Sequence, residues 1–181
     1  MKLGTTLDVA TREAWRQWLE RNFDKEKEIW LVYHRKASGK ARIPYDDAVE
    51  EALCFGWIDS TVKKIDDDSF AQRFTPRSLG TPVSEPNKER IRRLIAAGRM
   101  MPVGLAAAGD ISSKLEIAPD ILAALQQDKR TWANFEGFPE SYRIIRVAYV
   151  EGARRRPAEF SRRLNNLLRM TAQGKMFGMM R

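Results

Sequence analysis

The residues best suited to chemistry are Trp57, Asp59, Arg73 and Arg77, which fall on two stretches of alternating character separated by an acidic turn. This pattern predicts a β-hairpin. A turn centred near Asp67 makes Arg73 and Arg77 diagonal neighbours of Asp59 on one face, with Trp57 beside them. Two guanidiniums around one carboxylate leave a positive charge that can hold a carboxylate or phosphate in bidentate fashion. The pattern therefore indicates a small-anion pocket, for binding or for an enzyme.

The same residues have a purely structural interpretation. In the predicted register Asp59 lies opposite Thr75, and an ordinary cross-strand ion pair between Asp59 and a diagonal arginine would fix the pairing of the strands. A slip of one residue would move the charged side chains to opposite faces of the sheet. Both interpretations stay open at this point.

The single cysteine and the single histidine, Cys54 and His34, limit other kinds of site. One cysteine excludes an intramolecular disulfide and a CxxC motif, and one histidine excludes a multi-histidine metal site. Cys54 lies in the apolar run Ala-Leu-Cys-Phe-Gly and is predicted to be buried and unreactive, and His34 is predicted to be a solvated residue at a strand end. The sequence has no GxSxG, GxxxxGK[ST] or GxGxxG motif. We therefore predict no metal and no cofactor.

Length and composition indicate an ordinary globular chain. The 181 residues are 43% hydrophobic and 31% charged, which excludes collagen-like and disordered classes. No stretch approaches the roughly 20 apolar residues that a membrane span needs, and the first residues lack the apolar core of a signal peptide. A cytoplasmic protein without a membrane span is expected.

Positive charge is concentrated at the C-terminal end. The first 140 residues hold 22 Lys and Arg against 22 Asp and Glu, whereas the last 41 residues hold 10 against 2. Arginine-rich helices whose polar faces point to water would explain this, and so would a face that binds polyanions weakly, in a salt-sensitive and sequence-independent way. The candidate residues for such binding are Arg154, Arg155, Arg156, Arg162 and Arg163.

The elements that must position these residues form an α+β chain dominated by helix. About three strands, residues 28–34, 57–65 and 70–75, are predicted to form a small, mostly antiparallel sheet in the N-terminal half. Helices are predicted from Thr11 to Asn22 and from Tyr45 to a left-handed Gly56. After a loop over residues 77–82, the remainder of the chain is predicted to be helical. In the helix that begins at Glu140, the predicted inward face holds Ile145, Ala148, Tyr149 and Gly152, with Arg143 and Arg146 outside.

Longer blocks of the sequence resemble a known family. They are WLERN, EIWLVYHRK, YDDAVEEALCFGWIDS, QRFTPR, SEPNKERIRRLIAAGRMMPVGL and FEGFPESYRIIRVAYVEGARRRPAEFSRRL. Together they resemble the YdeI/OmpD-associated (OmdA-like) family, also labelled bacteriocin-protection proteins, from about Trp18 to Arg169. The resemblance implies an α+β core over residues 1–110 and an OmpD-associated-like helical region over 111–172 packed on that core. The residues after it, 173–181, are predicted to form a flexible tail.

The family pattern adds two residues to the candidate pocket. Ser84 and Asn87 match its WSxxN element, but Val83 stands where the family usually has tryptophan. The resemblance implies protection against bacteriocins or cationic antimicrobial peptides, and its name implies a protein partner, a porin; it implies no reaction and no catalytic residue. A non-enzymatic protective or interaction protein is thus the leading hypothesis. Polyanion binding and the hairpin pocket are the alternatives.

Overall fold

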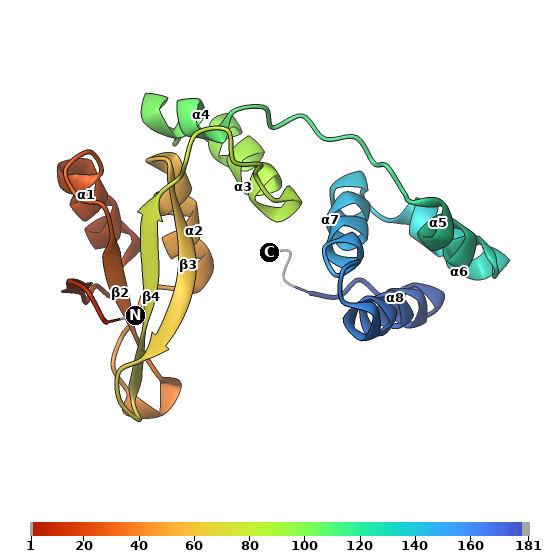
Figure 1. Ribbon diagram of the computed structural model, residues 1–181, viewed down its shortest axis with the longest axis horizontal. Coiled ribbons are helices and arrows are strands. Elements are labelled where there is room, and N and C mark those ends of the chain that lie inside the picture. The colour runs from red at the N-terminus through yellow and green to blue at the C-terminus, as the bar shows by residue number, and fades with distance from the viewer. Residues whose placement is uncertain (1, 179–181) are drawn as a thin grey trace. The chain divides into compact units, whose positions relative to one another are not determined.

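The computed structural model of the protein describes residues 2–178. The chain divides into two compact units, Met1–Ile111 (unit 1) and Ser112–Arg181 (unit 2). Unit 1 contains a four-stranded sheet and four α-helices, and unit 2 contains helices only in its described part (Figure 1). The predicted α+β class is confirmed. None of the helices within residues 2–178 has the length and apolar character needed to span a bilayer.

The sheet of unit 1 has the strand order β1-β2-β4-β3. β1 pairs parallel with β2, and the other two pairs are antiparallel. The sequence predicted about three strands and missed β1, since two residues are too short for an alternating pattern to be visible. The bounds are Thr6–Leu7 for β1, Ile29–His34 for β2, Trp57–Lys64 for β3 and Ser69–Pro76 for β4.

The helices of unit 1 begin and end at the predicted signals. The side chain of Thr11 accepts a hydrogen bond from Ala14 N and so caps α1, and Gly56 has a φ of 73° just after α2. A short 3₁₀ turn, Lys36–Ser38, follows β2. The α-helices are α1 (Arg12–Asn22), α2 (Tyr45–Cys54), α3 (Glu85–Ala96) and α4 (Pro102–Ala108).

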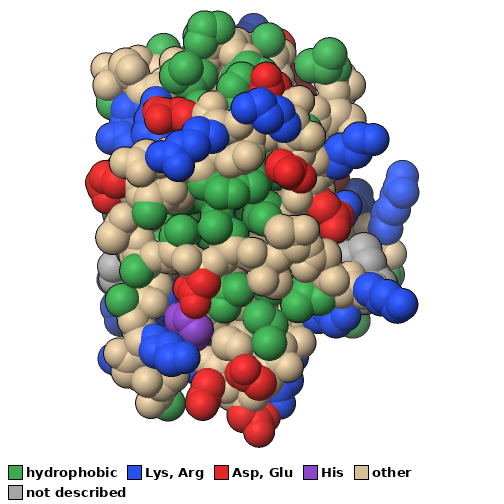
Figure 2. Space-filling view, turned by 90° about the vertical axis from the view of Figure 1, so that its left-hand side faces the viewer, with side chains coloured by type: hydrophobic (Ala, Val, Ile, Leu, Met, Phe, Trp, Pro, Cys, Tyr) green, Lys and Arg blue, Asp and Glu red, His purple; other side chains and the backbone are tan. Residues whose placement is uncertain are grey.

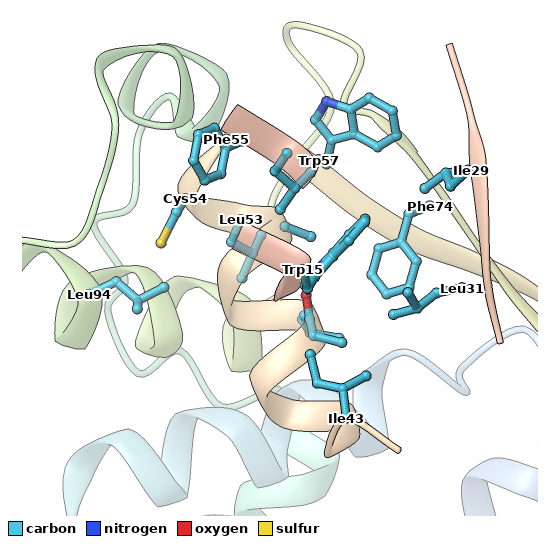
Figure 3. Close-up of a cluster of buried hydrophobic side chains, with 14 of the residues drawn as sticks. Trp15, Ile29, Leu31, Ile43, Leu53, Cys54, Phe55, Trp57, Phe74 and Leu94 are labelled. Atoms are coloured by element: carbon cyan, nitrogen blue, oxygen red, sulfur yellow. The ribbon is translucent and has the colours of Figure 1, made fainter. Parts of the chain in front are cut away.

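The core of unit 1 lies between the sheet and helices α1 and α2 (Figure 3). Trp15 of α1 packs on Phe74 of β4, with the ring centroids 5.5 Å apart, and its Nε1 donates to Ala48 O of α2. Aromatic rings of this size bury enough apolar surface to hold two helices on one sheet face. Val83, the residue at the family's tryptophan position, belongs to this core and is 6% exposed.

Helix α4 sits directly on the C-terminal end of α2. A Cβ on Gly104 would lie 2.2 Å from Cys54 O, and one on Gly56 would lie 2.9 Å from Ala107 Cβ. Met101 N donates to the same carbonyl of Cys54. The contact therefore requires glycine at position 104, because any side chain would collide with backbone. Cys54 is buried as predicted, on the side of α2 that faces Leu94 (Figure 3).

Unit 2 is a set of four helices around its own core. They are α5 (Pro119–Gln126), α6 (Lys129–Gly137), α7 (Glu140–Glu151) and α8 (Pro157–Ala172). Asp128 caps α6 by accepting a hydrogen bond from Thr131 N. The apolar side chains that fill the centre are Ile121, Leu125, Phe135, Val147, Val150 and Leu167.

The predicted inward face of α7 is partly wrong. Arg146 is only 9% exposed, whereas Tyr149 is 42% exposed. Arg146 is buried because its guanidinium stacks on the rings of Tyr142, Tyr149 and Phe177. An arginine can occupy an inner face when aromatic rings receive it, which hydrophobic periodicity alone does not reveal.

The finer domain predictions stay predictions: a helical region over 111–172 packed on unit 1, and a flexible tail over 173–181. Residues 179–181 lie outside the described residues. Within the described part of the tail, Phe177 N donates to Tyr142 Oη of α7.

Candidate functional site

The predicted hairpin pocket does not form. β3 contains an irregularity between Asp59 and Val62, so that Asp59 pairs with Phe74 instead of Thr75. Adjacent residues of a strand point to opposite faces, and Asp59 therefore lies on the face of Phe74, away from Arg73. The bulge produces the one-residue slip that separates the carboxylate from the arginine. The single-face network is wrong, and the pocket built on it is not supported.

Each member of the predicted pocket has another role. Arg73 bonds Glu28 through Nε at 2.6 Å, Arg77 donates to Thr81 O at 2.9 Å, and Trp57 Nε1 donates to Phe23 O at 3.1 Å. The bond from Arg73, which outweighs burial, lowers the pKa of Glu28 below its ordinary value. Trp57 is 1% exposed and packs edge-on against Trp18. These contacts connect the sheet to the segments that precede β2 and follow β4 and to the end of α1.

Asp59 instead forms the centre of a polar cluster with α2, which we call the Tyr45 cluster: Tyr33, Tyr45, Asp59 and Gln72. Tyr45 Oη donates to Asp59 Oδ2 at 2.9 Å, and Gln72 Nε2 donates to the same oxygen at 2.6 Å. The hydroxyl of Tyr33 is buried without a hydrogen-bond partner in the described chain. A buried hydroxyl that lacks a partner is uncommon and costs free energy, so it marks the cluster for attention.

Burial and the charge of Asp59 raise the pKa values of both Tyr33 and Tyr45. Burial, then the charge of Asp59 and its hydrogen bond, raise the pKa of Tyr45 to about 12. Burial, then Tyr45 and Asp59, raise the pKa of Tyr33 well above its ordinary value. Both hydroxyls therefore stay protonated and able to donate at neutral pH. Tyr45 already donates its one proton to Asp59, so Tyr33 is the hydroxyl of the cluster left to donate to a further polar group.

The two remaining pocket candidates, Ser84 and Asn87, belong to the beginning of α3. Asn87 Oδ1 accepts from Arg90 Nη1 at 3.0 Å, and Arg90 Nη2 donates to Asp46 Oδ1 at 2.7 Å. Asp46 is the neighbour of Tyr45 on α2. Ser84 occupies the N-cap position of α3, where its side chain makes no capping hydrogen bond. The structure thus links Asn87 to the beginning of α2, by way of Arg90.

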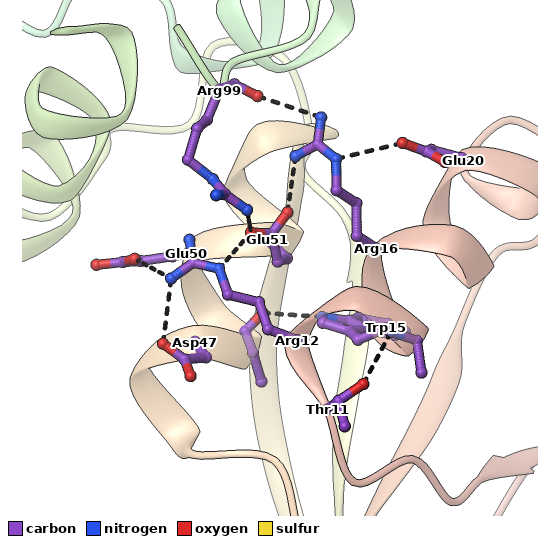
Figure 4. Close-up of polar contacts among 11 residues, drawn as sticks. Thr11, Arg12, Trp15, Arg16, Glu20, Asp47, Glu50, Glu51 and Arg99 are labelled. Carbon is purple, nitrogen blue, oxygen red and sulfur yellow. Dashed lines mark hydrogen bonds and ion pairs between the residues drawn. The ribbon is translucent and has the colours of Figure 1, made fainter. Parts of the chain in front are cut away.

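A second constellation, which the sequence reasoning missed, surrounds Glu51 (Figure 4). Glu51 is 0% exposed and receives three arginines, at distances of 2.5 Å from Arg12 Nε, 2.8 Å from Arg16 Nη1 and 2.5 Å from Arg99 Nη2. Burial alone would raise the pKa of Glu51, but the three hydrogen bonds outweigh it, so the pKa lies below the ordinary value. This carboxylate stays ionised and joins α1, α2 and the segment after α3.

The acidic residues beside Glu51 extend this network along α2. Asp47 and Glu50 both pair with Arg12, and Glu50 also pairs with Arg93. The three arginines that bond Glu51 lie 35 to 48 residues away from it in the sequence, which is why no local motif points to them. The network neutralises the acidic face of α2.

Cys54 and His34 do not form a catalytic pair. Burial, and then the charge of Glu51, raise the pKa of the Cys54 thiol to about 11. His34 Nε2 lies 2.8 Å from Asp8 Oδ2, and the His34 side chain is only 11% exposed, so its prediction as a solvated residue is wrong. Figure 2 shows this histidine beside an acidic side chain, on a face where hydrophobic side chains gather in the middle and charged ones surround them. Among residues 2–178, no group of three His, Cys, Asp or Glu could hold a metal ion.

Comparison with family models divides the chain into the same two parts. The model described as a domain of unknown function, DUF8412, matches residues 7–107, which is more than half of the chain. The chain belongs to the DUF8412 family. The model described as "Bacteriocin-protection, YdeI or OmpD-Associated" (OmdA) matches residues 114–174, and confirms the predicted resemblance there. The N-terminal blocks that we compared with the YdeI family fall within the DUF8412 match. Searches of curated proteins and of solved structures found no match.

The OmdA region contains the predicted polyanion-binding arginines, and three of the five form ion pairs. Arg154 bonds Asp120 and Glu151, and Arg162 and Arg163 both bond Glu159. The other two, Arg155 and Arg156, are exposed, with no ion pair to any described residue.

Proposed function

We propose that the protein is a non-enzymatic interaction protein that helps bacteria to survive bacteriocins or cationic antimicrobial peptides. The observation that carries this proposal is the match of residues 114–174 to the family model described in terms of bacteriocin protection. The state of the carboxylates in unit 1 also supports binding over catalysis. Glu28 and Glu51 are held by arginines and have lowered pKa values, so they are poor general bases at neutral pH.

The charge of the chain indicates which kind of partner fits. The net charge is +8, and the last 41 residues carry the excess. A basic protein repels cationic peptides, so capturing the peptide directly is electrostatically unfavourable. An acidic surface of another cytosolic protein is the better partner. The cytosol is the compartment we propose for the protein.

A survival assay tests this function. A bacterial strain in which the gene is deleted is compared with the parent and with the deletion strain complemented by the full-length gene. The deletion should lower survival in polymyxin B, a cationic peptide, or in a colicin, and complementation should restore it. Equal survival of all three strains in both agents would reject the protective role. An antibiotic without a peptide component, such as chloramphenicol, serves as the control for general sickness of the deletion strain.

Binding to nucleic acid or another anionic surface is a second candidate function. The exposed, unpaired side chains of Arg155 and Arg156 favour it, because they are free to contact phosphates. Arg154, Arg162 and Arg163 contribute less, since each is already held by a carboxylate. The expected binding is weak and independent of sequence.

The salt dependence of DNA binding tests this second candidate. Replacing Arg155 and Arg156 by glutamine should weaken binding to a short duplex and flatten the slope of log K against log salt by about 2. The exposed residues Lys36 and Lys40 of unit 1 provide the matched control, since the double variant to glutamine removes the same charge elsewhere. The same loss in both double variants, or no detectable binding by the wild type at about 50 mM salt, would reject this candidate.

A further inference from the structure

Arg146 of α7 is a buried cation. The residue is only 9% exposed, and its Nε is buried without a hydrogen-bond partner in the described chain. No Asp or Glu of the described chain forms an ion pair with it. Removing an unpaired guanidinium from water is costly, and natural proteins compensate such a charge. Burial accordingly lowers the pKa of Arg146 from its ordinary value.

Aromatic rings compensate only one side of this charge. The guanidinium carbon lies 5.6 Å from the ring centre of Tyr142, 5.7 Å from that of Tyr149 and 5.2 Å from that of Phe177. Ring faces attract the flat face of a guanidinium. They provide no acceptor for the N–H groups, which lie in the guanidinium plane and point outward from its edge. The edge of the group therefore still requires oxygen acceptors.

Further positive charge surrounds the same helix face. Arg143, three residues before Arg146, is its neighbour on α7, and its Nε is also buried without a partner. Arg163 of α8 stacks on Tyr149, one of the rings that also contact Arg146. Its guanidinium carbon lies 3.9 Å from the centre of that ring. Its charge is balanced by Glu159 at 2.6 Å. Arg143 and Arg146 are therefore the two arginines of this face that no carboxylate of residues 2–178 pairs with.

We propose that Arg146 binds the oxygen atoms of a phosphate group in unit 2, with Arg143 adding the second positive charge. The planar fork of a guanidinium matches two phosphate oxygens. Two arginines without a carboxylate suit a doubly charged phosphate better than a singly charged carboxylate. This site lies in the OmdA region, and it is independent of the protective role proposed above, since it rests only on the geometry around α7.

Thermal unfolding of the full chain tests the site. The melting temperature is measured in increasing inorganic phosphate and, as reference, in sodium chloride of equal ionic strength. The wild type should show a saturable rise in phosphate beyond that in chloride, because a ligand that binds the folded state stabilises it. Arg146→Gln should abolish this extra rise. Arg169→Gln, which removes another exposed arginine of α8, should leave it unchanged.

Arg146→Lys keeps the proposal testable if the glutamine variant does not fold, because lysine keeps the charge and loses the fork. It should shift the phosphate titration to at least several-fold higher concentrations. Vesicles containing phosphatidic acid, compared with phosphatidylcholine alone, show whether the phosphate of a lipid headgroup is also accepted. An equal response of the wild type to phosphate and chloride would overturn the proposal, and so would an unchanged phosphate titration in Arg146→Lys.

Discussion

Tyr45 Oη donates a hydrogen bond of 2.9 Å to Asp59 Oδ2, and this bond ties the first turn of α2 to β3. The two residues lie 14 positions apart. They stand at the beginning and near the end of the block YDDAVEEALCFGWIDS. The bulge of β3 turns Asp59 toward the helix-covered face, where Tyr45 and Gln72 meet it.

Replacing Tyr45 by phenylalanine should lower the free energy of unfolding by about 0.5–1.5 kcal/mol, the usual contribution of one hydrogen bond. Urea denaturation measures this as a lower midpoint at unchanged slope. A loss above about 3 kcal/mol would show that the hydroxyl has a partner beyond Asp59.

Replacing Asp59 by asparagine should lower the pKa of Tyr45 from about 12, because burial still raises it but the carboxylate charge no longer does. The phenolate absorbance followed during alkaline titration measures this shift. Asp24→Asn, in an exposed turn of unit 1, is the control and should leave the titration unchanged. An unaltered Tyr45 titration in Asp59→Asn would contradict the contact.

Replacing Glu51 by glutamine should destabilise the protein by about 3 kcal/mol, the lower end of the range for breaking a buried ion pair, since its arginines are partly exposed. Chemical denaturation gives the value. Glu26→Gln removes an exposed carboxylate of the same type and should change stability by less than about 0.5 kcal/mol. Similar losses in the two variants would mean that the network around Glu51 contributes nothing specific.

Acid should unfold the protein in part through Glu51. Its folded pKa is lowered, so the stability it contributes is fully present above the unfolded pKa of about 4.3 and is lost as pH falls through the folded pKa. The unfolded chain binds protons first, which favours unfolding in that window. The melting temperature of the wild type should therefore fall below about pH 4.3 more steeply than that of Glu51→Gln. Parallel curves would contradict the lowered pKa.

Replacing Gly104 by alanine should destabilise unit 1 by about 1–3 kcal/mol, because the new Cβ would lie 2.2 Å from Cys54 O. Gly137→Ala is the matched control, since nothing lies within 4 Å of a Cβ there. It should be neutral or slightly stabilising. Equal stability of the two variants in thermal unfolding would show that α4 does not pack closely on α2.

Cys54 should react slowly with thiol reagents in the native protein. Burial hinders access, and a pKa of about 11 leaves little thiolate at neutral pH. Labelling rates measured with and without denaturant check this expectation. Rapid native labelling near neutral pH would identify an activated thiol instead.

Local signals in the sequence were sufficient for most helix ends, whereas the site depended on contacts that local signals do not encode. Thr11 and Gly56 act as caps at the predicted places, since capping needs only neighbouring backbone groups. The register of the hairpin was wrong because the bulge after Asp59 has no signature in the alternation of residues.

Long-range electrostatics explain the other differences. Glu51 looks like a solvated member of an acidic helix until Arg12, Arg16 and Arg99 are brought to it from distant parts of the chain. Arg146 looks like an outer residue until the rings around it are known. Pairings of this kind depend on tertiary structure, which a pattern within one helix does not contain.

The acidic face of α2 has a consequence for the order in which unit 1 folds. Asp46 and Glu50, and likewise Asp47 and Glu51, are like charges four residues apart, and each such pair disfavours an isolated helix by about 0.2–0.5 kcal/mol. A peptide of residues 45–54 alone would thus be a poor helix at neutral pH. The arginines that relieve this repulsion come from both sides of α2 in the sequence, Arg12 before it and Arg93 after it. Helix α2 therefore becomes stable only once α1 and α3 have closed around it, late in the assembly of the unit whose centre it occupies.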